Sequence, residues 1–455
     1  MTKRTRFSPS TTQIILLSFL VAILLGSLLL SLPFATKSGE SVPYIDALFT
    51  ATTATCVTGL ITIPTATAWS LFGQIVILIL IQVGGLGIIT VMAGVMLALR
   101  RRMGLSDRLL LRDAFNLNTL SGLAEFLKKV LLGTLTVEMT GALLYMTVFV
   151  PEFGVKGIWI SVFNAVSAFC NAGMDIIGEN SLCNYATNPV VNGVTSALII
   201  LGGLGYIVWW DILRVLRLAW ERKSLRALAH LTLHSKLVIT ATAVLLLGGA
   251  IAIFLFEYKN PATIGSLSLL DKIQVAFFQS VTTRTAGFMT VSQTDLTNAT
   301  TVVCLILMFI GGSPVGTAGG IKTVTVLVLV AYAVSTVRGR NEVTAFHRRI
   351  SDDALRKAVA VTGMSFLIAA LSTIVLSALN PDRGLTDILY ETVSATATVG
   401  LSRDLTPCLS VAGKLTVAVT MYLGRVGPIS LAIAFGTKRE TQNIIKNPTE
   451  SVSVG

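Results

Sequence analysis

Four short segments of the chain share one pattern, in which an aromatic residue stands ten positions before a glycine and small or hydroxyl residues fill most of the space between. The segments are 49–59, 163–173, 277–287 and 390–400, and their final glycines are separated by 114, 114 and 113 residues. A period kept over three intervals marks repeated structural units. The fold therefore has to contain four copies of one structural unit.

Long apolar stretches flank these segments. Residues 14–32, 75–99 and 237–256 are each long enough to cross about 30 Å of hydrocarbon as a helix. Of all residues 53% are hydrophobic and 13% are charged, whereas about a quarter are charged in soluble proteins. The sequence predicts an all-α polytopic membrane protein in which each unit is a helix, a short re-entrant segment and a second helix, with two spans per unit.

The second helix of each unit carries a small-residue motif, at 84–87, 202–205, 311–314 and 424–427, and small residues let helices approach closely in a membrane. Asp46, Asp271 and Asp387 stand just before three of the re-entrant segments and are expected to cap their helices. The predicted organisation is a cytoplasmic N-terminus at 1–13, repeat 1 at 14–99, repeat 2 at 125–218, repeat 3 at 236–337 with a broken inner helix, repeat 4 at 357–436 and a cytoplasmic tail at 437–455.

The net charge of +12 is distributed unevenly along the chain. Basic residues gather in alternate loops, at 100–112, 214–226 and 338–349, while the intervening loops hold few. This is the positive-inside pattern of a multi-pass membrane protein, and it argues against nucleic-acid binding. Both termini are expected in the cytoplasm, and the basic loops also suit anionic membrane lipid.

The re-entrant segments are too short to cross a bilayer, so each needs protein or a water-filled cavity to shield its backbone. Four equivalent segments can shield one another around a common axis. Their helix C-termini would direct partial negative charge to one point, and the extended stretches before the glycines would present rings of backbone carbonyls to a cation. Glycine allows the dihedral angles that such alignment requires. One central cation pore is predicted.

At these residues the chain resembles the Trk, Ktr and HKT superfamily of potassium transporters, and within it the KtrB-type membrane subunits of bacterial Ktr systems. In that family glycine in every filter loop goes with potassium selectivity, and all four are glycine here. One departure is Cys170, where similar proteins often have asparagine. The resemblance implies that potassium binds backbone carbonyls of four filter segments: Thr55, Cys56, Val57, Thr58 and Gly59; Phe169, Cys170, Asn171, Ala172 and Gly173; Thr283, Arg284, Thr285, Ala286 and Gly287; Thr396, Ala397, Thr398, Val399 and Gly400.

Residues 311–320 contain five glycines and a proline, which cannot sustain a regular helix, yet apolar residues continue on both sides. The break is therefore expected at membrane depth, and the resemblance implies a gating loop there. Arg425 lies inside the inner helix of repeat 4 and is expected to pair with carbonyls of the broken helix. Lys322 is expected at the cytoplasmic edge of the gate or snorkelling to the surface, and Arg284 is expected to brace its loop. The predicted gate residues are Gly311, Gly312, Ser313, Pro314, Val315, Gly316, Thr317, Ala318, Gly319, Gly320, Lys322 and Arg425.

No catalytic constellation and no nucleotide-binding fingerprint is visible, so an enzyme is not predicted. Potassium is the only bound group expected of this chain. The resemblance implies a homodimer in the bacterial cytoplasmic membrane, docked on a cytosolic KtrA-like ring of RCK subunits that carries the nucleotide.

A rival interpretation is a secondary cation transporter with less selective potassium and sodium transport and a substrate site at broken helices. It requires buried carboxylates for coupling, and the clear apolar spans are nearly empty of them apart from Glu138. A membrane-embedded enzyme is a further rival, which the missing nucleophile, base and metal cluster disfavour. The sequence leaves sodium dependence and the mode of regulation open.

Overall fold

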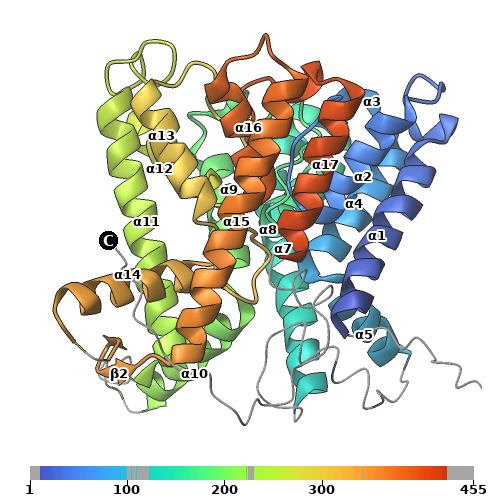
Figure 1. Cartoon of the computed structure of the whole chain (residues 1–455). Coiled ribbons are helices and arrows are strands. Elements are labelled where there is room, and N and C mark those ends of the chain that lie inside the picture. The colour runs from blue at the N-terminus through green and yellow to red at the C-terminus, as the bar shows by residue number, and fades with distance from the viewer. Residues whose placement is uncertain are drawn as a thin grey trace, which may run out of the picture.

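The computed structural model describes residues 11–99, 122–221, 230–340 and 342–427, with the single positions 104, 109 and 223. This part of the chain is almost entirely helical (Figure 1). The predicted cytoplasmic tail, most of the predicted N-terminus, the last residues of repeat 4 and nearly all of the first basic loop lie outside the described residues.

Each of the four units follows the same order of helices. Unit 1 contains α1 (Thr11–Leu30), η1 (Pro33–Ala35), α2 (Tyr44–Cys56), α3 (Thr65–Ala68), α4 (Leu71–Leu86) and α5 (Ile88–Ala98). Unit 2 contains α7 (Leu123–Phe153), α8 (Lys156–Phe169), η2 (Cys183–Tyr185), α9 (Pro189–Leu204) and α10 (Tyr206–Glu221). Unit 3 contains α11 (Leu233–Glu257), α12 (Leu269–Thr282), α13 (Asn298–Phe309) and α14 (Thr323–Val337). A hairpin of β1 (Thr344–Ala345) and β2 (Arg348–Arg349) leads to unit 4, with α15 (Asp352–Leu379), α16 (Leu385–Ala397), η4 (Thr406–Cys408) and α17 (Val411–Val426).

The first helix of each unit has the length and composition of a membrane span. Among the described residues four helices are long and apolar enough to cross a bilayer, or up to six if each of two bent pairs counts as one span. The shorter apolar helices α13 and α14 flank the break in unit 3. Because bilayer hydrocarbon takes about 20 apolar residues as a helix, these four long helices are the candidate membrane spans.

The second helices of units 1 and 2 are bent, which corrects the prediction of one bilayer-long helix over residues 75–99. α4 and α5 meet at 97°, and α9 and α10 meet at 98°. Gly87 and Gly205 stand at these bends with φ of 86°, and Gly427, which ends α17, has the same φ. Left-handed φ is accessible to glycine at little cost, so the last glycine of the small-residue motif ends the helix. Units 1 and 2 therefore interrupt their second helix as unit 3 does, whereas in unit 4 the described residues end at Gly427.

The short helices α2, α8, α12 and α16, here called the pore helices, carry the predicted filter segments at their C-terminal ends. Their N-caps are Pro43, Val155, Ser268 and Gly384, so the capping role predicted for three aspartates is wrong. These aspartates instead occupy the first helical turn, where negative charge favourably meets the helix dipole.

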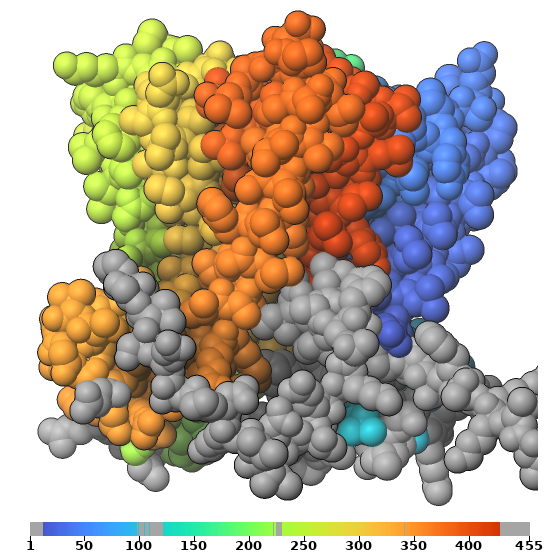
Figure 2. Space-filling model, viewed as in Figure 1, coloured from blue at the N-terminus to red at the C-terminus, as the bar shows by residue number. Residues whose placement is uncertain are grey.

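The second helix of each unit packs against the pore helix of the next unit. α4 contacts α8, α9 contacts α12, α13 contacts α16, and α17 contacts α2. The last of these contacts joins the fourth unit to the first and closes a ring. On the face seen in Figure 2 the red α17 of unit 4 lies beside the blue helices of unit 1, as the closed ring requires.

Candidate functional site

All four pore helices end in the same backbone turn. The residue two positions before each filter glycine has left-handed φ: Val57 at 52°, Asn171 at 58°, Thr285 at 64° and Thr398 at 52°. The glycines themselves also have positive φ: Gly59 at 100°, Gly173 at 65°, Gly287 at 83° and Gly400 at 98°. A non-glycine residue rarely adopts such φ unless its surroundings hold it there. Equivalent turns at four positions indicate that the units share one local structure at this site.

Each filter glycine lies against the segment of the next unit in the ring. A Cβ built on Gly59 would lie 2.6 Å from the carbonyl oxygen of Ala172, and one on Gly287 would lie 2.5 Å from that of Val399. The same relation joins Gly173 to the carbonyl of Ala286 and Gly400 to the carbonyl of Thr58. Any side chain at these glycines would collide with backbone. The structure thus brings all four predicted filter segments together around one centre.

The carbonyls that precede the filter glycines have no hydrogen-bond donor among the described residues. Thr58, Ala172, Ala286 and Val399 are all fully buried. The N–H groups beside some of them are satisfied, because Gly59 N donates to Thr53 Oγ1 at 2.9 Å and Gly400 N donates to Ser394 Oγ at 3.0 Å. Buried carbonyls are nearly always paired, and four unpaired ones gathered at one place suit a cation that has lost its water.

One face of this ring opens into a cavity of about 240 Å³ that all four filter glycines line. Asp175, Glu179 and Asp404 also line it. Of the twenty predicted filter residues only Gly173 is partly exposed, at the floor of this cavity, and the others are buried. A mouth lined by acidic side chains raises the local concentration of cations.

Residues 311–320, here called the gate segment, lie directly against the filter segments. Thr317 Oγ1 donates to Phe169 O at 2.9 Å and lies 3.1 Å from Asn171 Oδ1. Gly319 N donates to Thr285 Oγ1 at 3.1 Å. Most of the gate segment is buried, while Pro314, Val315, Gly316 and Gly320 are partly exposed. The segment therefore contacts the second and third filter segments directly, and none of its residues lines the acidic cavity.

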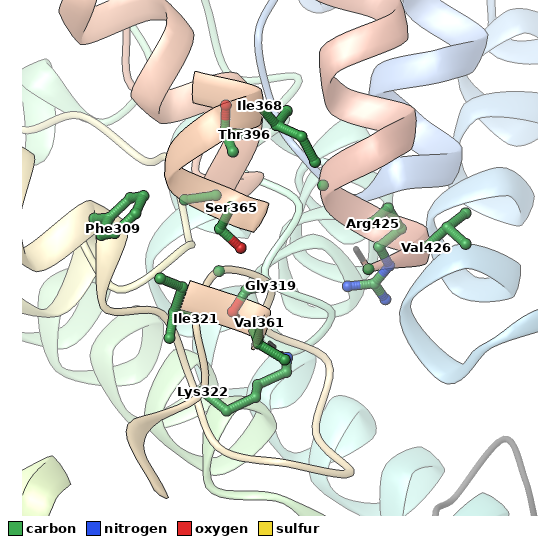
Figure 3. A pocket seen from close by; sticks show the side chains of 14 residues that line it. Phe309, Gly319, Ile321, Lys322, Val361, Ser365, Ile368, Thr396, Arg425 and Val426 are labelled. Carbon is green, nitrogen blue, oxygen red and sulfur yellow. Dashed lines mark hydrogen bonds between the residues drawn. The ribbon is translucent and has the colours of Figure 1, made fainter. Parts of the chain in front are cut away.

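Arg425 holds the gate segment from the end of α17. Its guanidinium donates to Thr317 O at 2.7 Å and to Gly84 O at 2.6 Å, which joins the gate to units 1 and 4. Lys322 Nζ donates to Ala318 O at 2.6 Å within the gate itself and does not reach the filter. Arg425 and Lys322 both line two cavities, of about 230 and 260 Å³, on either side of the gate segment. Figure 3 shows the first of these cavities, with both cationic side chains at its edge.

Arg284 donates hydrogen bonds to carbonyl oxygens outside the third filter segment. Its guanidinium donates to Gly311 O at 3.1 Å and to Thr242 O at 3.5 Å, and the residue is 6% exposed. Asn171 Nδ2 in turn donates to Arg284 O at 3.5 Å. The second filter segment, the third filter segment and the gate segment are therefore joined by hydrogen bonds.

Sequence reasoning missed the contact between the small-residue motifs and the filter. Cβ atoms built on Gly84, Gly202 and Gly424 would overlap the carbonyls of Thr55, Phe169 and Thr396 of their own units. The aligned glycines of the small-residue motifs are the sequence signal for this contact, but the motif by itself indicates only close packing between helices. They also give the pore helix room to end next to the second helix.

The chain is similar over nearly its whole length to known cation transport proteins. A family model described as TrkH cation transport protein matches residues 3–447. The chain is 38% identical to the potassium/sodium uptake protein NtpJ of Enterococcus hirae, over 100% of this chain and 99% of that one. It is 37% identical to the Ktr system potassium uptake protein B of Bacillus subtilis, over 97% of this chain and 96% of that one. The crystal structure of TrkH from Vibrio parahaemolyticus matches with a TM-score of 0.75 and 17% identity, over 96% of this chain and 86% of that one.

Proposed function

The chain belongs to the TrkH family of cation transport proteins, and on that premise we propose that it takes up potassium ions across a bacterial cytoplasmic membrane through the ring of its four filter segments. The names of its relatives support this substrate, since several are potassium uptake proteins. The four helices with the length of a membrane span agree with a multi-pass membrane protein.

The observation that carries the proposal is the set of four buried carbonyls without donors, at Thr58, Ala172, Ala286 and Val399. An ion enters from the acidic mouth, exchanges water for these oxygens and passes toward the gate segment. Backbone oxygens supply this coordination without proton transfer, so the site needs no catalytic side chain. The ring suits an ion whose hydration shell it can replace, which we take to be potassium.

A second candidate function is less selective transport of potassium and sodium, as a secondary cation transporter. The specific observation in its favour is the 38% identity to a protein named for both ions. The two candidates differ in the ratio of the two fluxes and in whether a second ion gradient drives uptake.

The gate segment is proposed to control flux below the ring. Its hydrogen bonds to Phe169 and Thr285 hold it against the filter, and Arg425 holds it to Gly84. Moving the gate segment exchanges these hydrogen bonds for hydrogen bonds to other groups. A partner subunit can supply the small free energy required, because an individual hydrogen bond contributes only about 1 kcal/mol net.

A partner subunit is part of the proposal. Relatives are named as proteins B and D of Ktr systems, which supports a multi-component assembly. We assign to this chain a homodimer docked on a cytosolic RCK-type, KtrA-like ring that binds the nucleotide. The exposed hairpin with Arg348 and Arg349 is a suitable contact for such a ring or for anionic lipid.

Ion flux into proteoliposomes tests the proposed function. Purified protein should give potassium uptake that exceeds sodium uptake from equal concentrations, driven by the membrane potential alone. Comparable fluxes of both ions, or dependence on an added sodium or proton gradient, would favour the second candidate. The absence of any cation flux with and without a partner ring would refute both.

A further inference from the structure

Glu138 carries a carboxyl group inside a membrane-length helix, and the proposed conduction path does not use this group. It lies in the middle of α7 and is 5% exposed. It does not line the acidic mouth or the two cavities beside the gate segment. An ionisable residue at this depth is costly and therefore requires an explanation.

Glu138 belongs to a polar cluster behind the second filter segment. Gln82 Nε2 of α4 donates to Glu138 Oε2 at 3.3 Å. The Cys170 thiol lies 3.6 Å from Gln82 Oε1 and 3.9 Å from Glu138 Oε1, and Cys170 is fully buried. Sulfur forms weak and long hydrogen bonds, so these distances are within its range. The cluster thus joins unit 1, the first helix of unit 2 and the filter.

The position of Cys170 makes this cluster relevant to the filter. Cys170 is the C-cap of α8, and the next residue, Asn171, has a left-handed φ of 58°. Gly173 follows three residues after Cys170 and lies against the carbonyl of Ala286. A displacement of Cys170 would therefore move the strained turn at Asn171 and, with it, the adjoining ring of carbonyls.

The equivalent position of the third unit is also anchored. Arg284 stands three residues before Gly287, as Cys170 does before Gly173, and its side chain donates to Gly311 O and Thr242 O. Two units thus hold the same position by side-chain contacts to surrounding helices.

Close packing adds to the hydrogen bonds. A Cβ built on Gly85 would lie 2.6 Å from Cys170 Sγ, so only glycine leaves room for the thiol at this place. The thiol is therefore held between the backbone of α4 on one side and the amide and carboxyl groups on the other.

We propose that Glu138 and Gln82 are positioning residues that hold the second filter segment through Cys170 and so contribute to cation selectivity. This inference rests on the proposed function, since it assigns the two residues to the same filter. It gives Glu138 a role other than that of a coupling carboxylate, which the rival transporter would require.

The experiment compares sodium and potassium fluxes in proteoliposomes for Glu138→Leu, Gln82→Leu and Glu138→Gln. Leucine removes the polar contact, so the sodium-to-potassium flux ratio should rise about fivefold, the change that corresponds to one lost hydrogen bond. Glutamine keeps the size and polarity of the side chain, so Glu138→Gln should stay within about twofold of the unaltered protein. The matched control is Tyr145→Phe, which removes a buried hydroxyl from the same helix as Glu138; this hydroxyl pairs with Thr195 of α9 rather than with a filter residue, so the ratio should stay unchanged.

Three outcomes would overturn the inference. One is an unchanged flux ratio for Glu138→Leu and Gln82→Leu in protein that elutes as the unaltered protein does. Another is a Tyr145→Phe ratio that rises as much as theirs, which indicates general loosening. The third is that Glu138→Gln abolishes uptake together with any dependence of uptake on a proton gradient, which would indicate a coupling carboxylate.

If the leucine variants do not fold, Cys170→Ala tests the same contact, and an unchanged flux ratio in that variant would equally refute the inference. Absence of potassium flux in the unaltered protein refutes the proposed function instead, and the inference with it.

Discussion

Lys414 of α17 donates a hydrogen bond of 2.6 Å to Asp46 of α2, although the two residues are 368 positions apart in the sequence. Their side chains are only 14% and 9% exposed. The pair joins the second helix of the last unit to the first pore helix, where the ring of units closes. A similar contact joins units 3 and 4. Arg403 of unit 4 pairs with Asp387 of the same unit and donates a hydrogen bond to the carbonyl oxygen of Gln293 of unit 3.

Lys414→Met should destabilise the protein, because it leaves the carboxylate of Asp46 buried without its cation. Removing one partner of a buried pair costs about 3 kcal/mol. Thermal unfolding of the purified protein, followed by tryptophan fluorescence, should show a lower midpoint. The double variant Lys414→Met with Asp46→Leu should recover part of the loss, and a double variant no more stable than the single one would contradict the explanation.

Gly59→Ser should raise sodium permeability relative to potassium. Gly59 has φ of 100°, and its new Cβ would lie 2.6 Å from Ala172 O, so the carbonyl ring has to shift. Flux ratios in proteoliposomes measure the effect. Gly363→Ser is the matched control, since nothing lies within 4 Å of its Cβ position in α15. An unchanged ratio in a transporting Gly59→Ser protein would remove this glycine from the filter.

Deleting residues 313–319 should raise potassium flux while the protein still assembles. The deletion removes Thr317 and Gly319, which bond the gate segment to the filter, and it shortens the obstruction. Uptake velocity, normalised to the amount of protein in the membrane, measures the effect. Loss of flux in a well-folded deletion variant would instead make these residues part of the conducting path.

Thr317→Val should also raise uptake velocity, since it removes the hydroxyl that donates to Phe169 O but keeps the shape of the side chain. Loss of about 1 kcal/mol corresponds to a change of about fivefold in the open population. The matched control is Thr323→Val, whose buried hydroxyl pairs with Ser313 rather than with the filter. Equal effects of both substitutions would mean that the gate segment is loosened generally and not released from the filter.

Arg425→Ala should increase uptake velocity and change apparent affinity little. The substitution removes a positive charge beside the pathway together with the bonds to Thr317 O and Gly84 O, while the filter stays untouched. Two charges about 4 Å apart interact by about 4 kcal/mol at an effective dielectric of about 20, and a quarter of that changes flux by about fivefold. Uptake kinetics in a potassium-requiring host provide the measurement. The same velocity as in the unaltered protein would exclude Arg425 from the gate.

Potassium uptake at low external concentration should fall as the pH drops from 7 to 5. Asp175 lies in the loop between α8 and η2, outside the membrane-spanning helices, and lines the acidic mouth. Burial raises the pKa of its carboxyl to about 6, against an opposing hydrogen bond from Ser181. Below that pH the mouth loses one negative charge, so fewer cations gather there. Asp175→Asn should lower uptake at pH 7 and flatten this part of the pH profile. A pH profile of the same shape in both proteins would assign the dependence to another group.

The sequence by itself determined the repeated units, their apolar membrane-length helices and the four glycines that the structure brings together. The period between Gly59 and Gly400 and the long apolar stretches are local or regular signals, and each follows from backbone geometry or from the cost of polar groups in hydrocarbon. Even the break at residues 311–320 could be predicted, because glycine and proline act on the chain next to them.

Only the tertiary structure decided which groups meet. Arg425 could be expected to find carbonyls, but its second acceptor is Gly84, more than 300 positions away, and any backbone oxygen has the same chemistry. The bend at Gly87 was hidden for a similar reason, since the GGLG pattern fits both a packed straight helix and a helix that ends. Partners such as Asp46 and Lys414, or Cys170 and Glu138, are fixed by how the units close around one another, which no local pattern encodes.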